Sequence, residues 1–145
     1  MTIRRTRPAL ALLSAGLLFP MALPAAAEAL FRPLPPAARD LDPMRWQKRP
    51  VLIFAPSESD PAYREQRALL EAAQPALQER DIVVLSDTDP AAGGALRKRL
   101  DPQGFTVMLV GKDGGIKITE RTPLSVERLV ETIDRMPMRR REVQP

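Results

Sequence analysis

The sequence has 145 residues, with no cysteine, no histidine, and 22 basic residues against 18 acidic ones. Without cysteine there is no thiol nucleophile, disulfide, dithiol redox pair or iron–sulfur cluster, so thiol oxidoreductase and peroxidase activities are excluded. Without histidine the chain lacks the commonest general base and metal ligand, which excludes a histidine-based catalytic triad, and we expect no cofactor.

Residues 1–27 have the features of a secretory signal peptide. Three arginines precede an apolar stretch over residues 9–23, and small residues follow that stretch. We expect cleavage after Ala27, with a cut after Ala29 as the second choice. The apolar stretch has about 15 residues, whereas a membrane-spanning helix needs roughly 20, so a retained anchor is disfavoured. The protein is therefore expected to be periplasmic or secreted.

Removal of this segment leaves a nearly balanced charge. Three arginines and no acid are lost, so 19 basic and 18 acidic residues remain. A nucleic-acid partner then lacks its main electrostatic support, and no other segment is long and apolar enough to span a bilayer. The partners we expect are an envelope protein or a small ligand.

Residues 28–49 form a proline-rich leader. Prolines disfavour helix and hold the chain extended, which favours a loose segment over residues 28–40. Leu30 and Phe31 are apolar enough to dock on the domain, which is the alternative. Trp46 is expected to pack on the domain, because a lone exposed tryptophan is costly. The prolines of the leader are Pro33, Pro35, Pro36 and Pro43.

The first predicted strand covers residues 51–55, a continuous apolar run typical of a strand buried on both faces. Pro56 ends this strand. A helix then begins at Pro61, with Asp60 as its N-cap. Pro75 must kink or divide the helix, because proline cannot donate the helical hydrogen bond.

A second buried-type strand covers residues 82–85, which makes a βαβ unit with parallel strands. A turn over residues 87–90 follows it. A short helix is expected over residues 91–100, weakened by two consecutive glycines. The third strand covers residues 105–110.

A tight Lys-Asp-Gly-Gly turn follows the third strand, and residues 116–119 pair back antiparallel. The last helix begins at Thr122-Pro123 or at Ser125 and ends at Pro137. Residues 138–145 are interpreted as a solvated basic tail. The apolar stripe of the last helix consists of Val126, Leu129, Val130, Ile133 and Met136.

These elements predict an α/β domain over residues 50–137, with the order β-α-β-α-β-β-α and a four-stranded mixed sheet flanked by helices. This is the thioredoxin-like arrangement, and the sequence resembles the thioredoxin superfamily over that region. It resembles more closely an uncharacterised family of exported bacterial proteins with a thioredoxin-like fold, domain of unknown function 4174. That resemblance implies the fold and favours the periplasm, and it carries no known activity. The matching stretches are residues 49–56, 80–84, 105–118 and 133–139.

The sequence departs from the redox members of this superfamily at the decisive loop. In thioredoxin-like enzymes the reactive cysteines follow the first strand and open the first helix. Here Ser57 and Ser59 stand in that region, and their hydroxyls are not ionised and have no histidine to activate them. Gly104 also takes the place of the proline that normally precedes the third strand. The resemblance therefore implies the fold without the redox activity.

The loop before the first helix is a candidate ligand site formed by Ser57, Ser59 and Asp60. A helix N-terminus offers free N–H groups and a dipole that favours anions. Glu58 and Asp60 repel an anion, however, so simple helix capping is the alternative interpretation.

A second hypothesis is a metal site at the same edge of the sheet. Asp87 and Asp89 follow the second strand, so their carboxylates would emerge beside Glu58 and Asp60. Four carboxylates could bind calcium or magnesium, although a solvated turn with side-chain caps is the commoner structure. The sequence thus favours an exported, non-redox binding or accessory module of the cell envelope. The alternative is a divalent-cation-dependent enzyme.

Overall fold

The computed structural model describes residues 29–145, so the predicted signal peptide and its cleavage point after Ala27 lie outside the described residues. A five-stranded mixed sheet with the order β1-β3-β2-β4-β5 lies at its centre. The strands are β1 (Phe31–Pro33), β2 (Arg49–Phe54), β3 (Ile82–Asp87), β4 (Thr106–Val110) and β5 (Ile116–Glu120).

The pairing of the strands follows the prediction for the central sheet. Strands β2 and β3 are parallel, β4 is antiparallel to β2, and β5 is antiparallel to β4. Every residue of β2 and β4 is buried, as their continuous apolar runs predict. The β4–β5 turn depends on Gly114, whose φ of 83° is unfavourable for residues with a Cβ.

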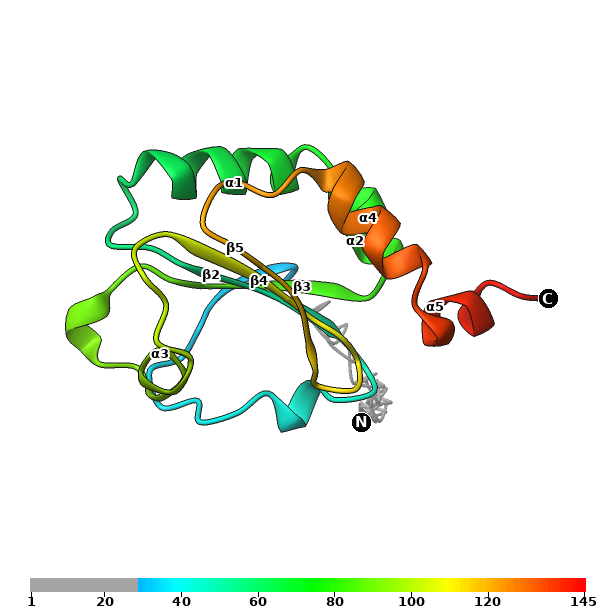
Figure 1. Cartoon of the computed structure of the whole chain (residues 1–145), viewed down its shortest axis with the longest axis horizontal. Helices are drawn as coiled ribbons and strands as arrows, with labels where there is room; N and C mark the ends of the chain where they lie inside the picture. The colour runs from blue at the N-terminus through cyan, green and yellow to red at the C-terminus, as the bar shows by residue number, and fades with distance from the viewer. Residues whose placement is uncertain (1–28) are drawn as a thin grey trace, which may run out of the picture.

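Helices cover both faces of the sheet. In Figure 1 the strands are seen nearly edge-on, with α1, α2 and α4 above them and α3 below. Side chains alternate along β2, so Val51 and Ile53 join one core cluster while Leu52 and Phe54 join the other. The helices are α1 (Pro61–Glu71), α2 (Gln74–Glu79), α3 (Ala95–Leu100), α4 (Val126–Asp134) and α5 (Pro137–Glu142).

The helix boundaries have identifiable causes. Asp60 caps α1 by accepting a hydrogen bond from the N–H of Tyr63 at 2.9 Å. Pro75 divides the first helical region into α1 and α2, as predicted. Of the two proposed starts of the last long helix, Ser125 is the cap, because its hydroxyl accepts from the N–H of Arg128 at 3.2 Å.

The leader differs from its prediction, and the sheet has five strands instead of four. Residues 31–33 were expected to be loose, but they pair in parallel with β3 as edge strand β1. Proline is tolerated at such an edge, because one side of the strand needs no sheet partner. Trp46 was expected to pack, yet 61% of its surface is exposed. Trp46 contacts the domain through its backbone, because its N–H donates a hydrogen bond to the carbonyl of Lys112 at 2.7 Å.

Two further expectations are corrected by the structure. Residues 91–100 form a 3-10 turn (Pro90–Ala92) and then α3, because Gly93 adopts a left-handed φ of 61° between them. Pro137 starts α5 instead of introducing a solvated tail, and Arg139 is buried. Within residues 29–145, no helix combines the length and apolar character that crossing a bilayer requires.

Candidate functional site

The serine loop, residues 57–60, connects β2 to α1 at the carboxyl end of the central strands. The hydroxyl oxygens of Ser57 and Ser59 lie 3.0 Å apart and share a hydrogen bond. Asp60 uses its carboxylate to cap α1. The structure therefore brings the three predicted ligand residues together, but it places a negative charge where an anion would approach the helix.

Asp87 lies at the end of β3 and forms an ion pair with Arg97 that no local sequence pattern indicates. Its carboxylate accepts hydrogen bonds from Nε and Nη2 of Arg97 at 2.9 and 3.1 Å. The same Nη2 donates to the carbonyls of Ala55 and Asp87 at 3.0 and 2.8 Å. The guanidinium carbon of Arg97 also lies 5.4 Å from the centroid of the Phe54 ring. Arg97 thus joins the ends of β2 and β3.

Three of the four carboxylates proposed for a metal site make contacts of their own. Asp87 pairs with Arg97, and Asp89 accepts a hydrogen bond from the N–H of Ala91 at 3.2 Å. Asp60 caps α1. Among the residues that the structure describes, no group of three or more acidic side chains could hold a metal ion. The hypothesis that Glu58, Asp87 and Asp89 bind a cation stays a prediction without geometric support.

A hollow of about 360 Å³ lies beside the serine loop, and we call it the serine-loop hollow. It combines aromatic and polar side chains, since Arg67 lies 5.2 Å from the Phe31 ring centroid and 3.4 Å from the Tyr63 hydroxyl. The bond to Tyr63 is the main cause that raises the pKa of Arg67, so its guanidinium stays charged. The lining residues are Phe31, Arg32, Pro33, Glu58, Tyr63, Arg67, Ser86 and Thr88.

A charge cluster occupies the opposite end of the sheet. Arg49 opens β2, is fully buried, and donates to both carboxylate oxygens of Glu142 at 3.1 and 3.2 Å. Nζ of Lys112 bonds to Glu142 at 2.7 Å and to Asp81 at 2.8 Å. Burial alone raises the pKa of Glu142, but the bonds from Lys112 and Arg49 outweigh it and lower that pKa.

The same cluster joins α5 to α2 and α4. Arg139 donates to the Glu79 carboxylate at 2.7 Å and to the Glu79 carbonyl at 3.1 Å. Arg80 bonds to both oxygens of Asp134 at 2.9 Å, and this contact lowers the pKa of Asp134. Sequence reasoning placed Arg139 in a solvated tail, because no local pattern links it to a glutamate 60 residues earlier.

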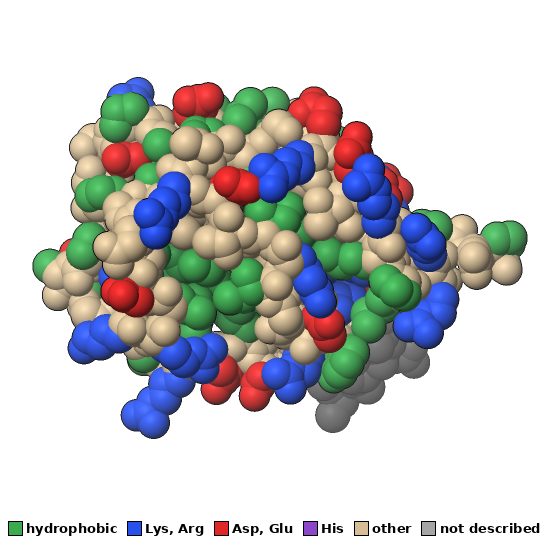
Figure 2. Space-filling view, in the orientation of Figure 1, with side chains coloured by type: hydrophobic (Ala, Val, Ile, Leu, Met, Phe, Trp, Pro, Cys, Tyr) green, Lys and Arg blue, Asp and Glu red, His purple; other side chains and the backbone are tan. Residues whose placement is uncertain are grey.

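Both signs of charge are mixed on the face of the molecule that Figure 2 shows. Figure 2 shows Lys and Arg side chains mixed with Asp and Glu on the face toward the viewer. This face lacks the single-sign field that typically attracts nucleic acids.

Sequence comparisons match this chain to a protein family and to a longer relative. Residues 40–142 match a family described as a domain of unknown function, DUF4174. Coiled-coil domain-containing protein 80 of Danio rerio is 28% identical over 133 residues, covering 71% of this chain. The match spans only 15% of that relative's length.

Two solved peroxidase structures share the fold. The reduced 2-Cys peroxiredoxin of Plasmodium vivax has a TM-score of 0.53 and 16% identity, covering 72% of this chain and 85% of that one. Thioredoxin peroxidase I of Plasmodium yoelii has a TM-score of 0.50 and 17% identity, covering 72% and 82%. At such low identity the likeness concerns the fold alone.

Proposed function

This chain belongs to the DUF4174 family of domains of unknown function, and we propose that it is an exported, non-redox binding module of the cell envelope. Its thioredoxin-like fold is retained, while the loop where redox relatives carry cysteines holds Ser57 and Ser59. Since the 145-residue sequence has no cysteine, the fold serves recognition instead of thiol exchange.

The observation that carries this proposal is the serine-loop hollow of about 360 Å³. Ligand sites are typically concave, with apolar walls and a few polar groups that fix orientation. The hollow offers the rings of Phe31 and Tyr63 as such walls, and Glu58 and Thr88 as polar groups at its margin. A partner side chain or a small ligand held there would lie against the serine loop.

The envelope location rests on the sequence of residues 1–27. Fractionation of host cells should recover the protein outside the cytoplasm, with a new N-terminus at Glu28. Deleting residues 2–27 should keep the protein in the cytoplasm. A full-length, unprocessed chain in the cytoplasm would contradict this part of the proposal.

Photo-crosslinking in intact cells tests the binding role. A photoreactive amino acid in place of the exposed Ser59 should give one reproducible adduct, because Ser59 directly follows Glu58, which lines the hollow. The same group in place of the exposed Glu131 on α4 is the matched control and should give none.

A pair of variants then asks whether the hollow holds the partner. Thr88→Trp fills the hollow and should abolish the adduct, whereas Thr88→Ser keeps the hydroxyl and should preserve it. Equal labelling from positions 59 and 131, or an adduct that survives Thr88→Trp, would overturn the proposal.

A further inference from the structure

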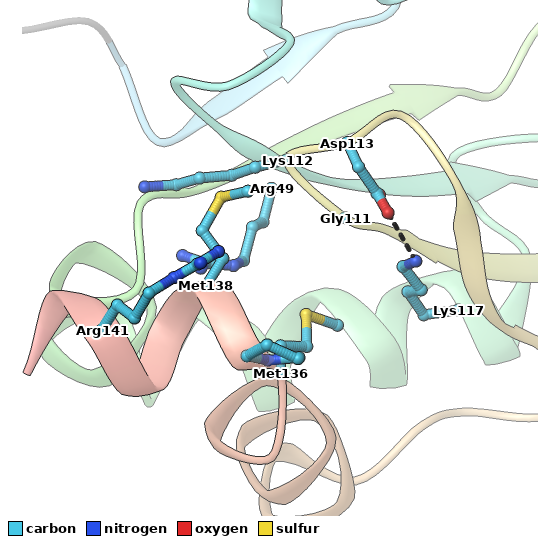
Figure 3. A pocket seen from close by; sticks show the side chains of 9 residues that line it. Arg49, Gly111, Lys112, Asp113, Lys117, Met136, Met138 and Arg141 are labelled. Atoms are coloured by element: carbon cyan, nitrogen blue, oxygen red, sulfur yellow. Dashed lines mark hydrogen bonds and ion pairs between the residues drawn. The ribbon is translucent and has the colours of Figure 1, made fainter.

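A second cavity, of about 230 Å³, lies between the β4–β5 turn and α5. We call it the arginine–methionine pocket. Figure 3 shows Arg49 and Lys112 entering from the sheet and Met136, Met138 and Arg141 from the α5 side. It is distinct from the serine-loop hollow, with which it shares no residue. The lining residues are Arg49, Gly111, Lys112, Asp113, Lys117, Met136, Pro137, Met138 and Arg141.

The cations around this pocket outnumber the acids that neutralise them. Lys117 pairs with Asp113 at 2.9 Å, as the dashed line in Figure 3 marks. Arg49 and Lys112 share Glu142, and Lys112 also contacts Asp81. Arg141 lines the pocket but forms no ion pair within residues 29–145. The pocket therefore carries an excess of about one positive charge.

Arg49 supplies a second observation, which concerns the hydrogen bonding of its guanidinium. Its side chain is fully buried, and its two Nη atoms are satisfied by Glu142 and by the carbonyl of Arg80. Its Nε, however, is buried without any hydrogen-bond acceptor. A buried polar group left unpaired is costly, and native structures normally provide a partner for it.

The remaining wall of the pocket is apolar and adaptable. Met136 and Met138 flank Pro137 at the start of α5, and both line the cavity. Methionine side chains adjust to irregular apolar groups and make favourable contacts with them. An occupant must therefore carry an apolar part as well as negative charge.

From these observations we propose that the arginine–methionine pocket binds an organic monocarboxylate that carries a short apolar group. The carboxylate accepts hydrogen bonds from Nε of Arg49 and from the guanidinium of Arg141, whose planar donors suit a planar anion. The single excess charge matches a monoanion better than a doubly charged phosphate. The apolar group lies against Met136 and Met138. This site is independent of the function proposed above.

Titration of the purified protein with butyrate at constant ionic strength tests the assignment. Butyrate should bind saturably and shift the amide resonances of Gly111 and Met138, while neutral butyramide should not. Inorganic phosphate, which lacks the apolar part, should bind at least tenfold more weakly than butyrate. Absence of saturable butyrate binding, equal binding of butyramide, or stronger binding of phosphate would overturn the proposal.

Two neighbouring arginines on α5 provide a matched pair of variants. Arg141→Gln should weaken butyrate binding about tenfold, because it removes a charge-assisted contact. Arg140→Gln removes the same charge from an exposed side chain outside the pocket and should change the affinity less than twofold. Equal loss in both variants would show only general electrostatic attraction and would contradict a specific site.

A second pair of probes separates a free acid from the carboxyl terminus of a peptide. N-acetyl-Ala-Val and its C-terminal amide are titrated in the same way. If the acid binds at least tenfold more tightly than butyrate and the amide does not bind, the natural ligand is a peptide terminus. If butyrate binds as well as the peptide acid, the ligand is a free carboxylic acid. In either case Arg141→Gln should weaken binding of the preferred ligand about tenfold. A preferred ligand whose affinity does not change in Arg141→Gln would contradict the site.

Discussion

At the scale of single residues, long-range ion pairs hold the two ends of the sheet. Arg97 fixes Asp87 and the adjoining carbonyl of Ala55 at one end, and Arg49 holds Glu142 at the other. Removing one partner of a buried pair costs far more than an exposed pair contributes, because the other charge stays desolvated. These residues should therefore dominate the response of the protein to mutation and to acid.

Arg97→Ala should lower the free energy of unfolding by about 3 kcal/mol, because the largely buried carboxylate of Asp87 loses its partner. Urea denaturation followed by circular dichroism measures the change. The exposed Arg99 on the same helix is the control, and Arg99→Ala should alter stability by less than about 0.5 kcal/mol. Equal effects of the two substitutions would contradict the structural role of Arg97.

Acid should destabilise the protein through Glu142 and Asp134. Both have pKa values lowered in the folded state, from ordinary values of 4.5 and 3.8, by their contacts with cations. A carboxylate with a lowered pKa contributes stability above its unfolded pKa and loses it as the pH falls through the folded value. Melting temperatures should thus stay level near neutral pH and fall below about pH 4.5.

The matching variant is Glu142→Gln, measured over the same range of pH. It should be less stable than the parent at pH 7 and should lose less stability between pH 5 and pH 3. An acid-induced loss identical to that of the parent would show that Glu142 is not one of the titrating groups.

At the scale of elements, the continuous apolar strands could be predicted from the sequence. The edge strand β1 and the ion pairs between elements could not. The predicted strand over residues 105–110 differs from β4 by one residue, since a buried run is readable locally. Strand β1 escaped prediction because three residues that include Pro33 show no alternation and depend on β3 for their pairing. The charged partners of Arg49 and Arg97 also escaped prediction. Glu142 lies 93 residues from Arg49, and Asp87, ten residues from Arg97, lies in a different element, so no helical spacing links either pair.

The sequence does not indicate that helix α5 contributes to stability, since these residues were expected to form a solvated tail. Ending the chain at Met136 removes Glu142 and Arg139, so Arg49 and Lys112 lose their shared carboxylate. This truncation should lower the free energy of unfolding by at least about 3 kcal/mol, measured in urea. Ending the chain at Glu142 removes only the exposed residues 143–145 and should cost less than about 0.5 kcal/mol. A stable chain ending at Met136 would show that α5 is dispensable.

At the scale of the whole molecule, the fold was predictable from the sequence, whereas the two cavities were not. Serines in the decisive loop are visible in the sequence, but a cavity depends on how distant elements meet. The serine-loop hollow needs β1, and the arginine–methionine pocket needs α5. Both elements lie in the segments that were expected to be loose.

The cation hypothesis also belongs to the whole molecule, because a ligand that binds only the folded state raises its melting temperature. Calcium or magnesium at 5 mM should leave the melting temperature unchanged within about 1 °C, since the four carboxylates do not form one cluster. A larger rise that Asp89→Asn removes would contradict this expectation and restore the metal site.

The bond between Arg49 and Glu142 also has a temporal consequence, because 93 positions separate the two residues. A growing polypeptide presents the arginine long before the glutamate is synthesised. The end of the sheet that holds Arg49 therefore cannot form this bond until Glu142 has been synthesised. If the chain is exported, as we propose, this delay helps to keep it from compacting before it passes through a translocation channel.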